Sequence, residues 1–259
     1  MTVDRDQMAA RIFLRAVLPV MKVLLTEDPK TKARFADVTA RVAFTAPDSG
    51  EGDPAQAWIA FDRGDFTIGF DACNDADITF AFGSLAKMNA FFAGKPVVPK
   101  IRGWWRLGLL LKVVGLLMGL KILMPDADPK DPAKRRLKVK MTFYMITTAL
   151  SQYNKGGDPE MVKWTSRQPE RIYQITVDED IAAYLRVKAG RSKAGRGTYK
   201  RRRPFVHMRF NGVEGAYPIV MNQVGMVDAV RQGLLTIDGS PEYAGNMGDF
   251  MVRIQDLIT

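Results

Sequence analysis

The chain has 259 residues, of which 47% are hydrophobic and 25% are charged, as in an ordinary globular protein, so wholesale disorder is excluded. Its 38 lysine and arginine residues against 28 acidic ones give a net charge of +10. That excess favours anionic partners, among them lipid headgroups, coenzyme phosphates and nucleic acid. The single cysteine, Cys73, and the single histidine, His207, exclude a disulfide framework and a multi-histidine metal centre. We therefore expect neither a metal nor a cofactor.

The start of the chain, Met1-Thr2-Val3-Asp4, lacks the short apolar core and small-residue cleavage site of a secretory signal. The most apolar stretch, residues 107–124, is interrupted by Lys112 and Lys121. A helix that spans a bilayer needs about 20 consecutive apolar residues. We therefore expect a cytoplasmic protein without a membrane span.

Hydrophobic periodicity predicts the elements of the first half. Residues 6–25 have apolar side chains at helical spacing, and Pro19 is expected to kink or restart that helix. Ser84 is expected to begin a short helix, 84–93, that stops at Gly94. Alternating segments predict strands at residues 38–45, 58–62, 66–71, 77–82 and 100–102, with a hairpin turn at Arg63-Gly64-Asp65 and a long apolar helix at 107–124.

Residues 126–133 are rich in aspartate and proline and lack apolar periodicity, so they are expected to be a linker. This divides the chain into two domains, residues 1–125 and 134–259. The second domain is expected to contain helices at 138–153, 159–166 and 247–258 and strands at 171–177, 183–188, 205–210 and 216–221.

The two halves are similar to each other, which indicates an internal duplication. Pairing Gly94 with Gly233 places the short helix of the first half over residues 224–232. The pairing also matches residues 78–82 with 217–221 and 100–103 with 236–239, and a shift of one residue matches 66–70 with 206–210.

Three segments of the first half carry a resemblance to a known family. They are the strand Asp77-Ile78-Thr79-Phe80-Ala81-Phe82, the helix that ends at Gly94, and Lys100-Ile101-Arg102-Gly103. From about residue 35 to 124 the chain resembles the sterol carrier protein type-two family of lipid-transfer domains. The second half is similar to a degenerate copy, in which Ala216 replaces the leading aspartate and Pro218 places the strand at a sheet edge.

The resemblance implies an α+β fold in which each domain is a curved mixed or antiparallel sheet, covered by helices, around an apolar tunnel. It also implies a non-catalytic protein that binds and transfers a sterol, a fatty acid or an acyl thioester. Methionine and phenylalanine suit a tunnel of this kind, although each is equally at home in a filled core. The residues expected to contact the ligand are Phe80, Phe82, Met88, Phe91, Phe92, Trp104, Trp105, Leu109, Val113, Leu116, Leu117 and Met118.

The long apolar helix has two interpretations. It is either buried at a domain junction or closes the tunnel and touches the bilayer, with Trp104 and Trp105 at the membrane interface. Gly108, Gly115 and Gly119 share one narrow face, which predicts close approach by another backbone.

A basic segment in the second half is either a solvated loop or hairpin tip, or a candidate for docking on an anionic membrane. No recognised nucleic-acid motif accompanies it, so nucleic acid is not an expected partner. Its cations are Arg186, Lys188, Arg191, Lys193, Arg196, Lys200, Arg201, Arg202 and Arg203, and residues 134–140 form a second basic cluster.

No residue stands out as catalytic. His207 shares its strand face with Phe205 and Arg209 and is expected to be structural, and Cys73 has no histidine near it in the sequence. The sequence therefore predicts binding rather than catalysis. Two alternatives stay open: an accessory subunit with filled cores, and a hydrolase or acyl-transfer enzyme.

Overall fold

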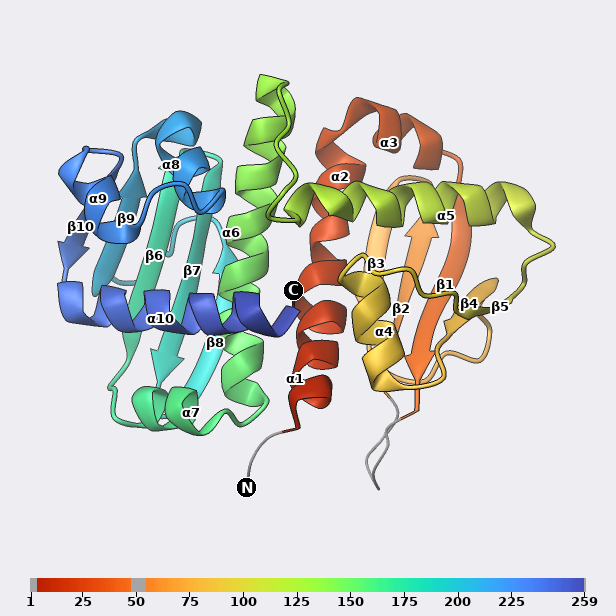
Figure 1. The fold of residues 1–259 in the computed structure, drawn as a ribbon, viewed down its shortest axis with the longest axis horizontal. Coiled ribbons are helices and arrows are strands. Elements are labelled where there is room, and N and C mark those ends of the chain that lie inside the picture. Colours follow the sequence, from red (N-terminus) through yellow and green to blue (C-terminus); the bar gives the residue numbers. More distant parts are fainter. Residues whose placement is uncertain (1–3, 48–54, 259) are drawn as a thin grey trace. The chain divides into compact units, whose positions relative to one another are not determined.

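The computed structural model describes residues 4–47 and 55–258. The chain divides between Lys121 and Ile122 into two compact units, residues 4–121 and residues 122–257. Each unit contains one five-stranded sheet and its own helices, so the predicted α+β class is confirmed (Figure 1). The division falls four residues before the predicted boundary at residue 125.

The helical start of the first unit is interrupted in its middle. A π turn over Phe13–Val17 and a 3-10 turn over Leu18–Val20 separate two α-helices, because Pro19 has no N–H to donate. The elements of this unit are α1 (Arg5–Ile12), α2 (Met21–Glu27), α3 (Pro29–Phe35), β1 (Thr39–Ala46), β2 (Ala55–Asp62), β3 (Asp65–Gly69), β4 (Ile78–Ala81), α4 (Leu85–Phe92), β5 (Lys100–Arg102) and α5 (Leu107–Gly119), followed by a 3-10 turn, Leu120–Leu123.

The first sheet is mixed, with the strand order β3-β2-β1-β4-β5. β1 and β4 are parallel, and the other neighbours are antiparallel. Alternate side chains of β1 and β4, including Phe44 and Phe80, are buried on one face, where these two rings stack 5.2 Å apart. The ring centroid of Phe92 in α4 lies 5.7 Å from that of Phe44 and 5.6 Å from that of Phe13. Helices therefore cover this face of the sheet.

The second unit begins at a long helix whose N-cap is Asp131, with Pro132 at its first position. The helix therefore starts inside the predicted linker, residues 126–133, and six residues before the predicted start at 138. The elements are α6 (Pro132–Lys155), α7 (Pro159–Ser166), β6 (Arg171–Asp178), β7 (Ile181–Lys188), β8 (Arg191–Arg196), β9 (Val206–Phe210), α8 (Gly212–Val220), α9 (Met226–Arg231), β10 (Leu235–Gly239) and α10 (Pro241–Ile258).

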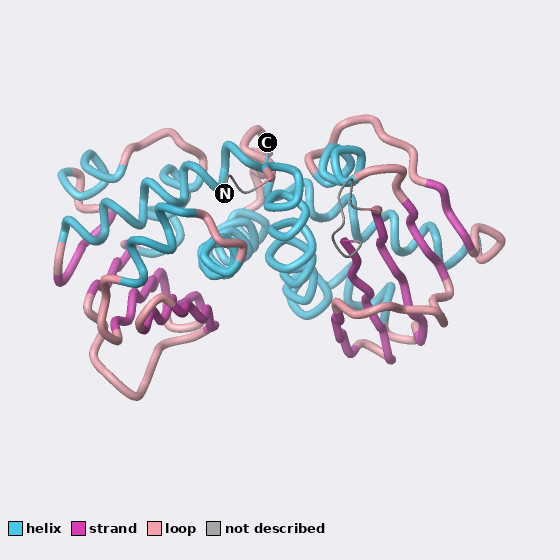
Figure 2. The backbone as a smooth tube through the Cα atoms, turned by 90° about the horizontal axis from the view of Figure 1, so that it is seen from below, coloured by secondary structure: helices cyan, strands magenta, loops and turns pink. Residues whose placement is uncertain are grey.

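The second sheet repeats the topology of the first. Its order is β10-β9-β6-β7-β8, with β6 and β9 parallel and the other neighbours antiparallel, so β6 to β10 correspond to β1 to β5. Figure 2 shows the strands of each unit side by side in one layer with helices against it. Both hairpins, β2–β3 and β7–β8, turn on two residues with positive φ, Arg63-Gly64 and Ala189-Gly190.

The registers of the two sheets match in detail. Trp58 is paired with Gly69, and Tyr184 is paired with Gly195 at the same distance from the hairpin turn. A Cβ on either glycine would lie 2.2 Å from the ring opposite, so each aromatic ring lies across a glycine. The chain is therefore duplicated at the level of strand order, turn and register.

Two of the predicted pairings between the halves agree with this topology and two are wrong. Gly94 and Gly233 both end a helix with positive φ, and strand β5 corresponds to β10. Residues 217–221, however, are not a strand, because 212–220 form α8 with Pro218 inside the helix. The true counterpart of β4 is β9, so the match of 66–70 with 206–210 is also wrong.

Strand β8 lies in the basic segment, where the sequence favours a solvated loop or a hairpin tip and no strand is expected. Arg191–Arg196 instead pairs with β7 along its whole length, although arginine, lysine and glycine are poor strand formers. The short helix α3 was also absent from the expected elements, whereas α9 forms where the pairing of Gly94 with Gly233 places a helix.

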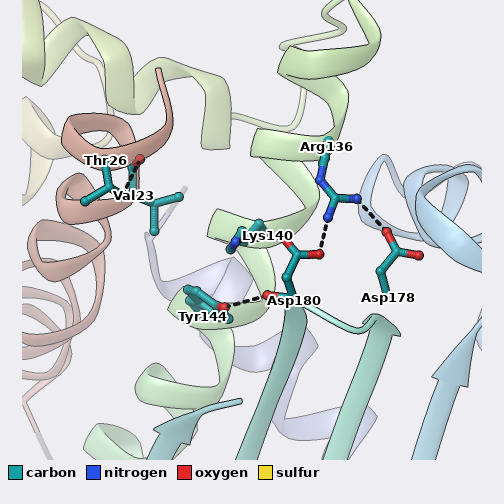
Figure 3. Close-up of polar contacts among 7 residues, drawn as sticks. All are labelled: Val23, Thr26, Arg136, Lys140, Tyr144, Asp178 and Asp180. Carbon is teal, nitrogen blue, oxygen red and sulfur yellow. Dashed lines mark hydrogen bonds and ion pairs between the residues drawn. The ribbon is translucent and has the colours of Figure 1, made fainter. Parts of the chain in front are cut away.

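An ion cluster holds the β6–β7 turn against α6 (Figure 3). Arg136 pairs with Asp178 at 2.5 Å and also with Asp180, and the Lys140 Nζ lies 3.1 Å from Asp180 Oδ2. The Tyr144 hydroxyl donates to the backbone carbonyl of Asp180 at 3.2 Å. The turn is therefore tied to the helix through both side-chain and backbone groups.

We expect Asp180→Asn to remove part of the acid dependence of stability. Hydrogen bonding by Arg136, and then by Lys140, holds the pKa of Asp180 below its ordinary value. A depressed folded-state pKa stabilises the protein above the unfolded pKa of about 4, and this stabilisation is lost as pH falls through the folded value. Because the side chain is half exposed, the expected loss at pH 7 is about 1 kcal/mol. Urea unfolding at pH 7 and near pH 3 measures it, since the difference should shrink as the pH falls below about 4.

The control is Glu179→Gln, which removes an exposed carboxylate from the same turn. It should leave the urea midpoint unchanged at both pH values. Equal losses in the two variants would contradict a specific role for Asp180.

Candidate functional site

The residues predicted to line a tunnel divide into three groups by exposure. The helix α4 places its phenylalanines against the sheet, and the rings of Phe82 and Phe91 lie 5.2 Å apart. Buried members are Phe80, Phe82, Met88, Phe92, Val113 and Leu116; half-buried members are Phe91, Leu109 and Leu117; exposed members are Trp104, Trp105 and Met118.

The turn before α5 is fixed by one aspartate. Asp77 accepts a hydrogen bond from the backbone N–H of Arg41 at 2.7 Å and pairs with Arg106 at 2.5 Å. Gly103 adopts a φ of +76°, and a Cβ there would lie 2.0 Å from the Asp77 carbonyl oxygen. These contacts fix the backbone between β5 and α5, the connection that contains Trp104 and Trp105.

Exposed apolar side chains follow one face of α5. Leu107, Leu111, Val114 and Met118 recur at a spacing that keeps them within one helical face. Leu111 is 71% exposed, and Trp105, just before the helix, is 68% exposed. We call this set the apolar stripe: Trp104, Trp105, Leu107, Leu111, Val114 and Met118. A contiguous exposed apolar surface of this kind marks an interaction site.

The opposite face of α5 is anchored. Val113, Leu116 and Leu120 are buried. A Cβ on Gly115 would lie 2.5 Å from Arg34 Nη1, and one on Gly119 would lie 3.0 Å from Leu24 Cδ1. The predicted close approach therefore occurs at two of the three glycines, and side chains of α2 and α3 make it rather than a backbone. At Gly108 a Cβ would meet no atom within 4 Å.

The segment of the chain that contains the apolar stripe carries charge of one sign. Residues 78–121 contain no aspartate or glutamate and carry seven cations. Arg106 is paired with Asp77, which lies just before this segment. The seven are Lys87, Lys95, Lys100, Arg102, Arg106, Lys112 and Lys121.

In the second unit, His207 lies in a pocket of about 490 Å³ beside Arg209 and Asp238. Its Nε2 lies 2.9 Å from the Thr176 hydroxyl, and Arg209 Nε donates to its Nδ1 at 3.4 Å. Burial, and then the charge of Arg209, lowers the pKa of His207, so the ring is neutral at pH 7. Asp238 pairs with Arg209 rather than with the imidazole. The ring is thus held between Thr176 and Arg209.

Cys73 is half-buried, and its Sγ lies 3.5 Å from Asp75 Oδ1. Burial raises the pKa of the thiol, so the protonated form dominates at neutral pH. Within residues 4–47 and 55–258, no group of three or more histidine, cysteine or acidic side chains is placed to hold a metal ion. Across the same residues, every helix is too short or too polar to cross a bilayer.

No family model matches the chain, and no curated protein matches it either. Among solved structures, the chain is similar to the sec-alkylsulfatase Pisa1 from Pseudomonas sp., with 13% identity and a TM-score of 0.27. The match covers 55% of this chain and 28% of the sulfatase, and a double mutant of that sulfatase matches equally. The chain thus matches little more than a quarter of the length of these enzymes.

Proposed function

We propose that the protein binds a hydrophobic or amphipathic ligand, such as a sterol, fatty acid or acyl thioester, and exchanges it at an anionic membrane surface without catalysing a reaction. The observation that carries the proposal is the apolar stripe of α5. Exposing six large apolar side chains costs free energy in water, and contact with lipid would recover it.

The ligand would enter along α5. The half-buried side chains Leu109 and Leu117 lie on the same helix as the apolar stripe, and Phe91 lies on α4 beside the phenylalanines of the sheet. Each of these side chains is neither fully exposed nor fully buried, as expected where an alkyl chain would pass from the surface to the core. The resemblance to the sterol carrier protein type-two family points to the same position for the ligand.

The charge of the segment that contains α5 supports an anionic lipid surface as the exchange partner. Seven cations without an acid between residues 78 and 121 attract negative headgroups, each contributing about 1 kcal/mol close to the surface. Tryptophan side chains such as Trp104 and Trp105 are favoured at the level of the headgroups. A cytoplasmic location remains a prediction of the sequence.

We expect the purified protein to carry a co-purified lipid and to move a fluorescent fatty acid between vesicles. Native mass spectrometry detects the first as an added mass that disappears under denaturing conditions. A transfer assay between donor and acceptor vesicles measures the second, and phosphatidylserine in the acceptor should accelerate it. A protein that carries no lipid and transfers none would be an accessory subunit with filled cores instead.

A further inference from the structure

The exposed face of the second sheet carries like charges directly opposite each other. Arg186 is paired with Lys193 and Lys188 with Arg191 across β7 and β8. Like charges in such positions destabilise a sheet. Residues 181–213 contain ten cations and no acid. Compensating charge comes from Glu170, before β6, which lies 2.7 Å from Arg186 and 3.8 Å from Lys188.

The first sheet shows that the fold does not require these cations. Counted from the equivalent hairpin turn, Ala60 is paired with Thr67 where the second sheet has Arg186 and Lys193. Asp62 and Asp65 take the positions of Lys188 and Arg191. Both sheets have an aromatic residue opposite a glycine, Trp58 with Gly69 and Tyr184 with Gly195, but only the second sheet has the cations. The cations are therefore particular to the second unit, and the shared fold does not account for them.

Five cations line a pocket of about 330 Å³, here called the basic pocket: Arg186, Lys193, Arg196, Lys200 and Arg201. No carboxylate lines it. Arg186 is paired with Glu170 at 2.7 Å. Lys193, Lys200 and Arg201 have no ion-pair partner among the residues that the structure describes. At least three cationic side chains are thus available to an anion.

The pocket is held in shape by a buried side chain beneath it. Gln174 is fully buried, and its Nε2 donates to the carbonyls of Ala183 at 3.0 Å and Gly197 at 3.3 Å. Its Oε1 accepts from the backbone N–H of Tyr199 at 3.0 Å. The segment after β8 is therefore fixed across the sheet, with the ring of Tyr199 packed 5.0 Å from that of Tyr184. Because this wall is preformed, a ligand would bind at a small ordering cost.

We propose that the basic pocket binds a compound carrying two or more phosphate groups, either the phosphorylated headgroup of a lipid or a free polyphosphate. Lysine and arginine donate charge-assisted hydrogen bonds to phosphate oxygens, and several of them around one concave site favour clustered phosphates over a single carboxylate. Tyr184 and Tyr199 add hydroxyl groups and an apolar wall at the inner end.

The test is calorimetric titration of the whole protein with inorganic tripolyphosphate and with inositol 1,4,5-trisphosphate at roughly physiological salt. Lys193→Gln/Lys200→Gln should weaken binding of both probes about tenfold, since each lost charge-assisted bond is one of a few. The matched control, Lys155→Gln/Lys163→Gln, removes two exposed lysines of α6 and α7 and should change affinity less than about twofold.

Vesicles separate the two sources of phosphate. Tighter binding to phosphatidylinositol bisphosphate in phosphatidylcholine vesicles than to the free trisphosphate supports the headgroup, and equal or weaker binding supports a free polyphosphate. Absence of binding to every multiply phosphorylated probe, or equal losses in the two variants, overturns the proposal. It is also overturned if a short single-stranded oligonucleotide binds more tightly than the trisphosphate and displaces it. The basic pocket belongs to the second unit, so none of these results bears on α5.

Discussion

Gly239→Ala is expected to lower the stability of the second unit by about 3 kcal/mol, and Gly103→Ala should do the same to the first. Both glycines have positive φ, +102° and +76°, which an L side chain rarely adopts. A Cβ on Gly239 would lie 2.0 Å from the carbonyl oxygen of Phe205, and one on Gly103 would lie 2.0 Å from that of Asp77. Backbone cannot move aside as a flexible side chain can, so the clash adds to the conformational cost.

The controls are Gly64→Ala in the first unit and Gly233→Ala in the second. Both glycines have positive φ, but an added Cβ would meet no atom within 4 Å. These variants should lose only about 1 kcal/mol, the conformational cost alone. Hydrogen exchange read peptide by peptide assigns each loss to its unit. Equal losses at Gly239 and Gly233 would show that the strand moves and relieves the clash.

Sequence alone could predict the elements whose local signals were strong. Ser84 caps α4 by accepting from the Lys87 N–H at 3.2 Å, and Gly94 follows its end with positive φ, as the sequence indicates. The strand at 100–102 and the turn at Arg63-Gly64 were confirmed for the same reason. In each case the residues that define the element are next to one another in the chain.

The misplaced elements depended on distant partners. Tyr217, Ile219 and Met221 alternate as in a strand, but three alternating residues also fit one side of a short helix, and α8 forms there. Strand β8 is held by its pairing with β7 and by the turn at Ala189-Gly190, although its residues are poor strand formers. Pairing with β7 therefore decided the structure of β8, and the local alternation could not decide between strand and helix at α8.

The lipid site stays a prediction, and the structure gives only the exposure of its residues. Sequence placed Trp104 and Trp105 at an interface, and the structure exposes both. It could not separate exposed Leu111 from buried Leu116, because α5 is apolar on nearly every face and the periodicity carries no information. The basic pocket was missed as a pocket because Gln174, which fixes its wall, lies on another strand and carries no charge.

Leu107→Gln/Leu111→Gln is expected to weaken binding to phosphatidylserine vesicles about a hundredfold or more while leaving the stability of the first unit nearly unchanged. Both side chains are more than half exposed, at 60% and 71%, so little folded-state packing is lost. Transfer of a leucine from water into an apolar environment is worth about 2 kcal/mol, and two such losses multiply. Vesicle sedimentation measures the binding, and urea unfolding measures the stability.

Val227→Gln/Val252→Gln is the matched control, because it removes two exposed apolar side chains, 74% and 58% exposed, from α9 and α10. It should bind vesicles as the unsubstituted protein does. Raising the salt concentration should weaken binding of both the control and the unsubstituted protein, since the cations near α5 attract the headgroups through screened charge. The leucine substitutions could leave binding unchanged while added salt released the protein from the vesicles. That result would show that charge alone holds the protein on the membrane, and that the apolar stripe is covered by a protein partner instead.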